Sequence, residues 1–355
     1  MIQLMVREVQ GSINVVVRAP NALGDLVMAT PAFARLANHF GQENLTLVCL
    51  PIGVPLLEGN AWFREILPYD RKGAHRGLLG GARFARELRR RKFDLGFVFP
   101  NSFSSAWLFL QGRVKKRVGY FKDGRSFMLH KGRQRDTDAD GKFVPKYTGQ
   151  YFMELLDTVE VEPGELRPTL PISQDERARA SAFLSDNDLL GGPLVICAPG
   201  GAFGPSKLWA FERYARVLNS LADEGAKVLI SHAPNETPEA EAVLKEAGRR
   251  YPTIAGLDLG ALKGVYERAA LVLTNDTGPR HIAVALGRPV ICVMGPNDPR
   301  YTALPQVERG EVIREAVDCS PYSWPCQLKE CPIDHRCMEA ITVERVLVAC
   351  RRELA

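Results

Sequence analysis

Short apolar runs alternate with amphipathic stretches along the first half of the chain. The runs are "INVVVRAP" (residues 13–20), "LTLVCL" (45–50), "EILPYD" (65–70), "DLGFVFP" (94–100) and "KRVGYF" (116–121). After the first run, "GDLVMATPAFARLANHF" (24–40) places Leu26, Phe33, Leu36 and Phe40 roughly on one helical face. Strands that alternate with helices in this way predict a parallel sheet with crossover helices.

The same alternation restarts in the second half. Strands are predicted at "PLVICAPG" (193–200), "AKVLISHAP" (226–234), "ALVLTND" (270–276) and "RPVICVMGP" (288–296), with helices at 209–225, 236–250 and 341–354. Between the two series, residues 164–176 contain two prolines and suit a crossover between domains. We therefore predict an α/β protein with two doubly wound, Rossmann-like domains, at residues 1–175 and 186–338.

Composition indicates a soluble globular protein with an uneven charge distribution. The 355 residues suffice for two domains, and no apolar run approaches the roughly 18 residues that span a bilayer. The first residues lack a signal-peptide pattern, so we expect a cytoplasmic protein. Residues 71–146 hold 20 Lys and Arg against 6 Asp and Glu, a net charge of +14 in a chain of +5. This excess suggests nucleic acid, an anionic membrane face or an acidic glycolipid as partner, or only a solvated surface.

A polar motif lies where the predicted strand 270–276 meets a helix. In "TNDTGPRHIAVALG" (274–287), Gly278 and Pro279 are expected to begin the helix, whose first N–H groups favour an anion. Asp276 and Thr277 can cap that helix or reach a ligand, and His281 can point the same way. The alternative is that Asp276 and Thr277 only cap and that His281 only packs.

A turn-rich loop follows the predicted strand 193–200. "APGGAFGPSKLW" (198–209) matches neither the P-loop spacing nor the dinucleotide fingerprint. Ser206 and Lys207 nevertheless offer a hydroxyl and a cation beside exposed backbone N–H groups, which together suit a diphosphate. A plain surface loop with a solvated lysine is the alternative.

Two carboxylates follow other predicted strands. Asp25 opens the helix after the first strand, where it either caps or stands as a general base for an incoming hydroxyl. Glu236 follows the strand 226–234 and either accepts hydrogen bonds from a ribose or caps the next helix.

Four cysteines cluster near the end of the chain. Cys319, Cys326, Cys331 and Cys337 are separated by seven, five and six positions, with His335 nearby. Zinc sites favour shorter gaps between paired ligands. Reduced structural thiols are therefore preferred over a metal site or a disulfide, and we assign no metal ligand and no cofactor.

Three segments together resemble glycosyltransferase family 9, the ADP-heptose:lipopolysaccharide heptosyltransferases, and within it the heptosyltransferase II group. They are "NALGDLVMATPAFARL", "PGGAFGPSKLW" and "TNDTGPRHIAVALGRPVICVMGP". The resemblance implies a GT-B fold, with an acceptor domain, a nucleotide-sugar domain, and a C-terminal helix (339–355) that packs back on the first domain.

The resemblance also implies roles for the motif residues. Asp25 would be the catalytic base of an inverting transfer. The implied donor-binding residues are Lys207, Asp276, Thr277, Gly278 and His281, with Gly201, Ser206 and Glu236 as weaker candidates. The donor would be ADP-heptose and the acceptor the anionic inner core of lipopolysaccharide at the inner face of the cytoplasmic membrane, with peripheral membrane contact. The basic segments 83–92 and 113–117 would touch that acceptor or anionic lipid.

Other functions fit the sequence less well. A family 9 transferase that uses another sugar or a protein acceptor stays open. A nicotinamide dehydrogenase predicts a glycine fingerprint after the first strand, but "RAPNALGD" contains a single glycine. A nucleic-acid-binding protein predicts aromatic side chains interleaved with the basic ones, whereas only scattered Phe occur, so no nucleic-acid partner is expected.

Overall fold

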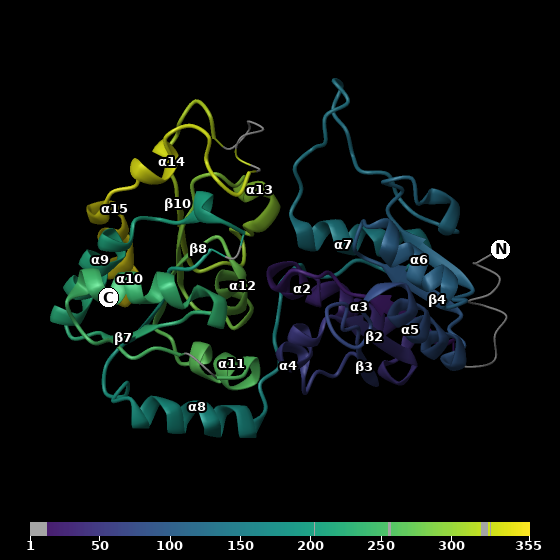
Figure 1. Cartoon of the computed structure of the whole chain (residues 1–355), viewed down its shortest axis with the longest axis horizontal. Coiled ribbons are helices and arrows are strands. Elements are labelled where there is room, and N and C mark those ends of the chain that lie inside the picture. Colours follow the sequence, from purple (N-terminus) through teal and green to yellow (C-terminus); the bar gives the residue numbers. More distant parts are fainter. Residues whose placement is uncertain (1–12, 202, 255–256, 321–325, 327) are drawn as a thin grey trace. The chain divides into compact units, whose positions relative to one another are not determined.

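The protein consists of two compact units, Met1–Pro171 and Ile172–Ala355. The computed structural model describes residues 13–201, 203–254, 257–320, 326 and 328–355. Each unit contains one five-stranded parallel sheet covered by helices (Figure 1). The predicted α/β fold with two doubly wound sheets is therefore confirmed.

The first sheet has the strand order β3-β2-β1-β4-β5. Its strands are β1 (Val15–Arg18), β2 (Leu45–Cys49), β3 (Glu65–Pro68), β4 (Leu95–Val98) and β5 (Lys116–Gly119). The three valines of β1 are fully buried at the centre, as expected for a strand whose two faces are both covered. All five strands match the runs predicted from the sequence.

Helices of the first unit connect these strands. They are α2 (Leu23–Met28), α3 (Thr30–Phe40), α4 (Val54–Leu57), α5 (Gly77–Arg91), α6 (Phe103–Gln111) and α7 (Thr148–Leu156). The single helix predicted over residues 24–40 is in fact two, α2 and α3, which meet at Ala29. Pro31 lies in the first turn of α3, where its missing N–H costs no hydrogen bond. The polar stretch 122–146 contains the short turn η3 (Ser126–Met128) and two isolated bridges, from Lys131 to Val118 and between Thr137 and Phe143.

The second sheet has the strand order β10-β9-β8-β6-β7. Its strands are β6 (Leu194–Ala198), β7 (Lys227–Ile230), β8 (Leu271–Asn275), β9 (Val290–Val293) and β10 (Gly310–Ile313). The sequence analysis missed β10, because an edge strand with one fully buried side chain, Ile313, shows little apolar pattern.

Helices α8 (Gln174–Asp186), α9 (Phe211–Asp223), α10 (Thr237–Ala247), α11 (Leu259–Glu267), α12 (Gly278–Ala285), α13 (Pro299–Thr302), α14 (Arg336–Glu339) and α15 (Val343–Leu354) belong to the second unit. Helix α8 packs on α11 and lies in the second unit, which begins at Ile172.

The C-terminal helix α15 is packed within the second unit. It contacts α9 and β8, β9 and β10 of that unit. Its apolar face carries Val346, Ala349 and Cys350, each with 0% exposure, and these join the same core cluster as Trp209 and Tyr214. The second sheet therefore uses this helix as its own cover. No helix among the described residues is long and apolar enough to cross a membrane.

Candidate functional site

The two motif loops of the second unit lie next to each other at the point where the strand order reverses. Ala198 at the end of β6 pairs with Thr274 near the end of β8, so the loops that follow these strands leave the sheet side by side. The Asn275 amide donates hydrogen bonds to the carbonyls of Pro199 (2.9 Å) and Gly200 (3.1 Å) and joins the two loops. Parallel sheets bind ligands at such a reversal.

Lys207 and Asp276 meet across these loops. Lys207 ends the turn η5 (Pro205–Lys207), and its Nζ donates to the Asp276 carbonyl at 3.2 Å. The same nitrogen lies 3.7 Å from Asp276 Oδ2 and 5.3 Å from the ring centre of Phe203. Both side chains are largely buried, at 16% exposure for Lys207 and 5% for Asp276. A cation is thus held beside the beginning of α12.

Arg280 is the site residue that the sequence analysis missed. Its Nη1 lies 2.7 Å from Asp276 Oδ1, and its Nη2 lies 2.9 Å from Glu308 Oε2. The Arg280 side chain is fully buried. The available signal was the i,i+4 spacing of Asp276, just before α12, and Arg280, in its first turn. These two carboxylates, the guanidinium and the Lys207 ammonium together form a charge-balanced network.

This network sets the charge of Asp276 and His281. Burial alone would raise the pKa of Asp276, but Arg280 and Lys207 outweigh it and hold that pKa well below its usual range. Burial, with the Arg280 charge, lowers the pKa of His281 to about 4. His281 Nε2 lies 4.0 Å from Asp276 Oδ1. At neutral pH the site therefore contains an ionised Asp276 and an uncharged His281.

Of the two readings left open for Asp276 and Thr277, side-chain capping of α12 is not found. Thr277 occupies the N-cap position of α12, and Gly278 begins the helix as predicted, but neither motif side chain caps it. The Asp276 carboxylate is engaged instead by Arg280, Lys207 and the Asn297 amide.

The three weaker candidates, Ser206, Glu236 and Gly201, make contacts within the protein. The Ser206 hydroxyl is buried and donates its hydrogen bond to the Leu328 carbonyl at 2.9 Å. Glu236 accepts from its own turn, at 3.1 Å from the Ala233 N–H. The Glu236 carboxylate also packs against Gly200. A Cβ added to Gly200 would lie 2.5 Å from the carboxyl carbon of Glu236. Gly201 packs under Leu208, where an added Cβ would lie 2.9 Å from the side chain.

A pocket opens on the exposed side of Lys207. It encloses about 500 Å³, which suits a nucleotide-sized ligand. Its lining residues are Phe203, Lys207, Pro296, Asn297, Asp298, Tyr301, Thr302 and Cys326. Tyr301 and Asn297 were not predicted, because they follow β9 in a segment without a recognised motif.

Asp25 belongs to the first unit. It lies in the first turn of α2, is half-buried, and its main-chain carbonyl accepts the Ala29 N–H at 2.9 Å. The preceding strand ends at Arg18, which is 1% exposed and donates to the Ala19 carbonyl and the Asn21 side chain. Burial lowers the pKa of Arg18 to about 10, so it keeps its charge at neutral pH.

Comparisons with known proteins agree with this architecture. The sequence profile described as "Glycosyltransferase family 9 (heptosyltransferase)" matches residues 81–335. Lipopolysaccharide heptosyltransferase 2 of Escherichia coli is 28% identical over 315 residues, which cover 85% of this chain and 88% of that protein.

Solved structures of this family share the fold. A family 9 glycosyltransferase from Veillonella parvula superposes with a TM-score of 0.85 at 22% identity, covering 97% of both chains. The E. coli ADP-heptose lps heptosyltransferase II superposes with a TM-score of 0.77 at 23% identity, covering 96% of this chain and 98% of the other. The expected GT-B architecture is confirmed, and the chain is an enzyme that belongs to glycosyltransferase family 9, the heptosyltransferases.

Proposed function

We propose that this protein transfers a heptose from ADP-heptose to the inner core of lipopolysaccharide. The E. coli relatives are named for this donor and for lipopolysaccharide. The observation that carries the proposal is Lys207, held 3.2 Å from the Asp276 carbonyl at the beginning of α12 and at the wall of a pocket. A fixed cation and a helix N-terminus are suited to a diphosphate leaving group.

The reaction is an inverting displacement. The acceptor hydroxyl oxygen bonds to the anomeric carbon while the bond from that carbon to the diphosphate oxygen breaks. The hydroxyl proton passes to the Asp25 carboxylate, and ADP leaves with the bonding electron pair. Lys207 and the first N–H groups of α12 stabilise the charge that develops on ADP. The neutral His281 and the backbone at Thr277 and Gly278 contact the donor.

Asp25→Asn tests the proposed base. We expect kcat to fall by about 10²- to 10⁴-fold, the usual contribution of a general base, with ADP affinity unchanged. Initial rates with ADP-heptose and a lipopolysaccharide acceptor give kcat, and calorimetry gives the ADP affinity. Glu58→Gln, at an exposed carboxylate of the same unit, is the matched control. A wild-type rate in Asp25→Asn would exclude Asp25 as the base, and retention of the anomeric configuration in the product would exclude inversion.

The donor nucleotide is tested by calorimetry with ADP, UDP and GDP, followed by ADP-heptose. We expect ADP to bind in preference to the other two, and ADP-heptose to bind more tightly than ADP. Equal binding of all three nucleotides, or none, would contradict the assignment of the second unit to an ADP-sugar.

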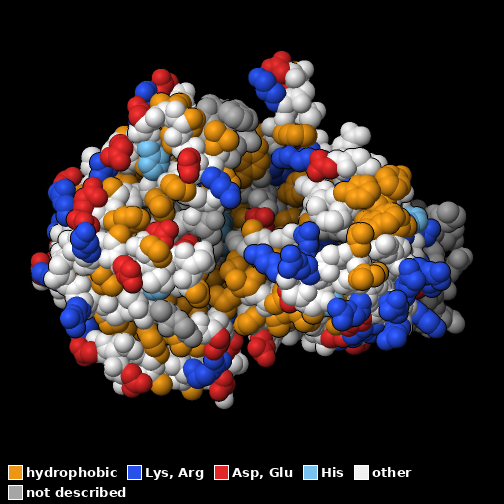
Figure 2. Space-filling view, viewed as in Figure 1, with side chains coloured by type: hydrophobic (Ala, Val, Ile, Leu, Met, Phe, Trp, Pro, Cys, Tyr) orange, Lys and Arg blue, Asp and Glu red, His pale blue; other side chains and the backbone are white. Residues whose placement is uncertain are grey.

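The acceptor is proposed to meet the basic surface of the first unit. Figure 2 shows lysine and arginine side chains grouped beside apolar ones on this unit. Arg86 and Arg90 of α5 and Arg113 are exposed, and guanidinium groups pair well with carboxylates and phosphates. Changing all three to Glu should raise the acceptor KM and leave ADP affinity intact. Reversing Arg216, Lys245 and Arg250, exposed on the second unit, is the control. Unchanged acceptor kinetics in the first variant would contradict this assignment.

Helix α5 is also proposed to contact the membrane surface. Leu78 and Leu79 in its first turn are 93% and 89% exposed, and three arginines lie in its last turn. Exposed leucines beside basic side chains are typical of helices that lie in a lipid interface. Replacing both leucines with Ser should reduce co-sedimentation with vesicles of anionic phospholipid. Equal sedimentation of variant and wild type would exclude this contact.

A further inference from the structure

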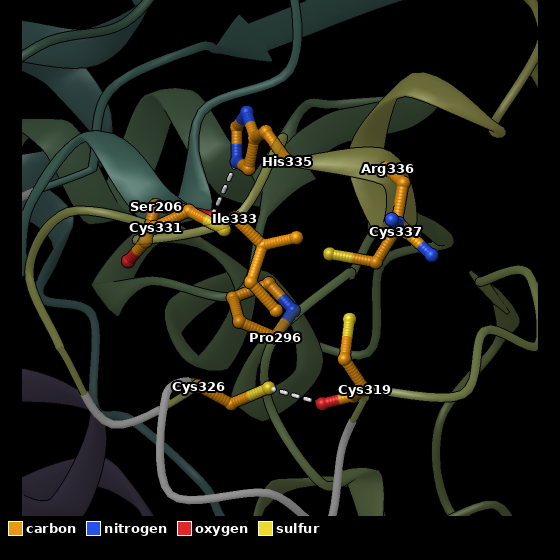
Figure 3. A pocket seen from close by; sticks show the side chains of 9 residues that line it. All are labelled: Ser206, Pro296, Cys319, Cys326, Cys331, Ile333, His335, Arg336 and Cys337. Carbon is orange, nitrogen blue, oxygen red and sulfur yellow. Dashed lines mark hydrogen bonds between the residues drawn. The ribbon is translucent and has the colours of Figure 1, made fainter.

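Four cysteines of the second unit line one small cavity. Cys319, Cys326, Cys331 and Cys337 surround a space of about 20 Å³, roughly the room of one water molecule or one ion (Figure 3). The remaining wall consists of Ser206, Pro296, Ile333, His335 and Arg336. The other four cysteines, at positions 49, 197, 292 and 350, are buried in the sheets and in α15 as small apolar side chains. Apolar packing alone therefore does not account for the cluster.

Two of the thiols in this cluster face each other. Figure 3 shows the sulfurs of Cys319 and Cys337 turned toward each other. The Cys326 thiol donates to the Cys319 carbonyl at 3.1 Å, which brings the two arms of the segment together. Cys337 is buried, and Cys319, Cys326 and Cys331 are half-buried. All four belong to one stretch of the chain, so closing them around a common point requires only local movement.

We propose that Cys319, Cys326, Cys331 and Cys337 bind one thiophilic divalent metal ion, such as Zn²⁺ or Fe²⁺, as a closed structural site. Binding exchanges four S–H protons for four metal–sulfur bonds and changes no oxidation state. Four protein ligands leave no open position, which is typical of a structural rather than a catalytic site. Among the described residues, no three His, Cys, Asp or Glu side chains are already gathered around one metal position, so the thiols must turn further inward on binding.

The position of the cavity suggests what the ion would stabilise. The Ser206 N–H donates to the Lys329 carbonyl at 2.9 Å, and the Ser206 hydroxyl donates to the Leu328 carbonyl at 2.9 Å. His335 Nε2 lies 2.7 Å from the Ser206 carbonyl. The cysteine segment thus holds Ser206 by three hydrogen bonds, and the next residue is Lys207.

Close packing strengthens this connection. A Cβ added to Gly204 would lie 2.7 Å from the Lys329 carbonyl oxygen. The loop that presents Lys207 therefore rests directly on the segment that carries the cysteines. We infer that the metal fixes the donor-binding lysine indirectly, as a positioning element, and this consequence rests on the proposed function.

The metal content of the full-length protein tests the site itself. Elemental analysis of protein purified without chelator and without a metal-affinity tag should give about one zinc or iron per chain. Co²⁺ added to the chelator-stripped protein should produce thiolate-to-cobalt charge-transfer absorption and the visible bands of tetrahedral cobalt. No bound metal together with no thiolate–cobalt band would overturn the proposal. Mass spectrometry of alkylated protein, with and without prior reduction, detects disulfides. A disulfide between any of these cysteines would overturn the proposal as well.

Single substitutions locate the ligands. Cys331→Ser and Cys319→Ser should each lower metal retention and the thermal midpoint, whereas Cys49→Ala, at a buried thiol of the first unit, should retain the metal. Retention of the metal in both Ser variants would place it elsewhere.

A separate experiment tests whether the metal positions Lys207. Chelation should weaken ADP affinity measured by calorimetry, and restoring the metal should recover it. An unchanged ADP affinity in the stripped protein would refute the link while leaving the metal site standing. Failure of the metal-loaded wild type to bind ADP would instead contradict the proposed function.

Discussion

The carboxyl-terminal edges of the two sheets both bury arginine, but they neutralise it differently. In the second unit, Arg280 contacts two carboxylates, Asp276 at 2.7 Å and Glu308 at 2.9 Å. In the first unit, the hydrogen bonds of Arg18 and Arg125 go to main-chain carbonyls and to the side-chain oxygens of Asn21 and Asn101. One edge is charge-balanced, and the other keeps its positive charge.

This difference in net charge indicates which kind of charged ligand each edge can bind. In the second unit the balanced network leaves Lys207, at 16% exposure, as the cation next to the pocket. In the first unit a net positive edge favours an anionic molecule, because neutral oxygens satisfy the guanidinium hydrogen bonds without cancelling the charge. This contrast agrees with a donor site that places one cation at a diphosphate and an acceptor site that attracts a polyanion.

The largest expected effect is on stability, from Arg280→Met. This change leaves the buried Asp276 carboxylate and the partly buried Glu308 carboxylate without this cation, which should lower the free energy of unfolding by about 3–5 kcal/mol. Arg125→Met is the matched comparison, because it removes a guanidinium that is also fully buried but strands only neutral acceptors. Its cost should be smaller, about 1–3 kcal/mol.

Denaturant unfolding of both variants measures the two costs. If Arg125→Met costs as much as Arg280→Met, the contrast between a balanced and an unbalanced edge is wrong.

The next effect is on catalysis, from Lys207→Met. Loss of one fixed electrostatic contact to a developing charge should lower kcat/KM for the donor by about 10²- to 10³-fold. The KM for the acceptor should stay unchanged, because the first unit keeps its charge. Steady-state kinetics with each substrate varied separate the two parameters. Lys227→Met, at a lysine paired with Asp188 on the surface, is the control. A larger change in acceptor KM than in donor KM would reverse the proposed division of labour.

The sequence predicted the sheets better than the site. Buried parallel strands such as 15–18 and 271–275 are continuous apolar runs, so their positions follow from the sequence alone. The edge strand β10 and helix α6 lack a clear periodic pattern and were missed. The C-terminal helix was recognised as a helix, but its amphipathic pattern does not say which sheet its apolar face covers.

The sequence predicted which motif residues lie at the site, but not which side chains or carbonyls they contact. Lys207, Asp276 and His281 were chosen because they follow strands of the second half, and the strand order brings their loops together. The partner of Asp276 is Arg280, and that of the Ser206 hydroxyl is the Leu328 carbonyl, 122 positions along the chain. The Asp276–Arg280 pair is local and was overlooked, whereas the Ser206–Leu328 pairing depends on tertiary packing, which a local motif does not encode.

The last expected effect is negligible at neutral pH and appears only in acid, in the pH dependence of stability of the second unit. The pKa of His281 is lowered from its ordinary value of 6.5 to about 4, by burial first and then by Arg280. Between these values the unfolded chain binds a proton that the folded chain does not, so stability falls as the pH falls from 6.5 toward 4. The loss should reach roughly 3 kcal/mol at the lower end. His281→Gln should remove this component, so that wild type and variant diverge with pH below 6.5 and keep a constant difference above about pH 7.5. Unfolding free energies of both proteins across this range measure it. A constant difference down to pH 4 would mean that His281 titrates as it does in the unfolded chain, and that the Arg280 network does not act on it.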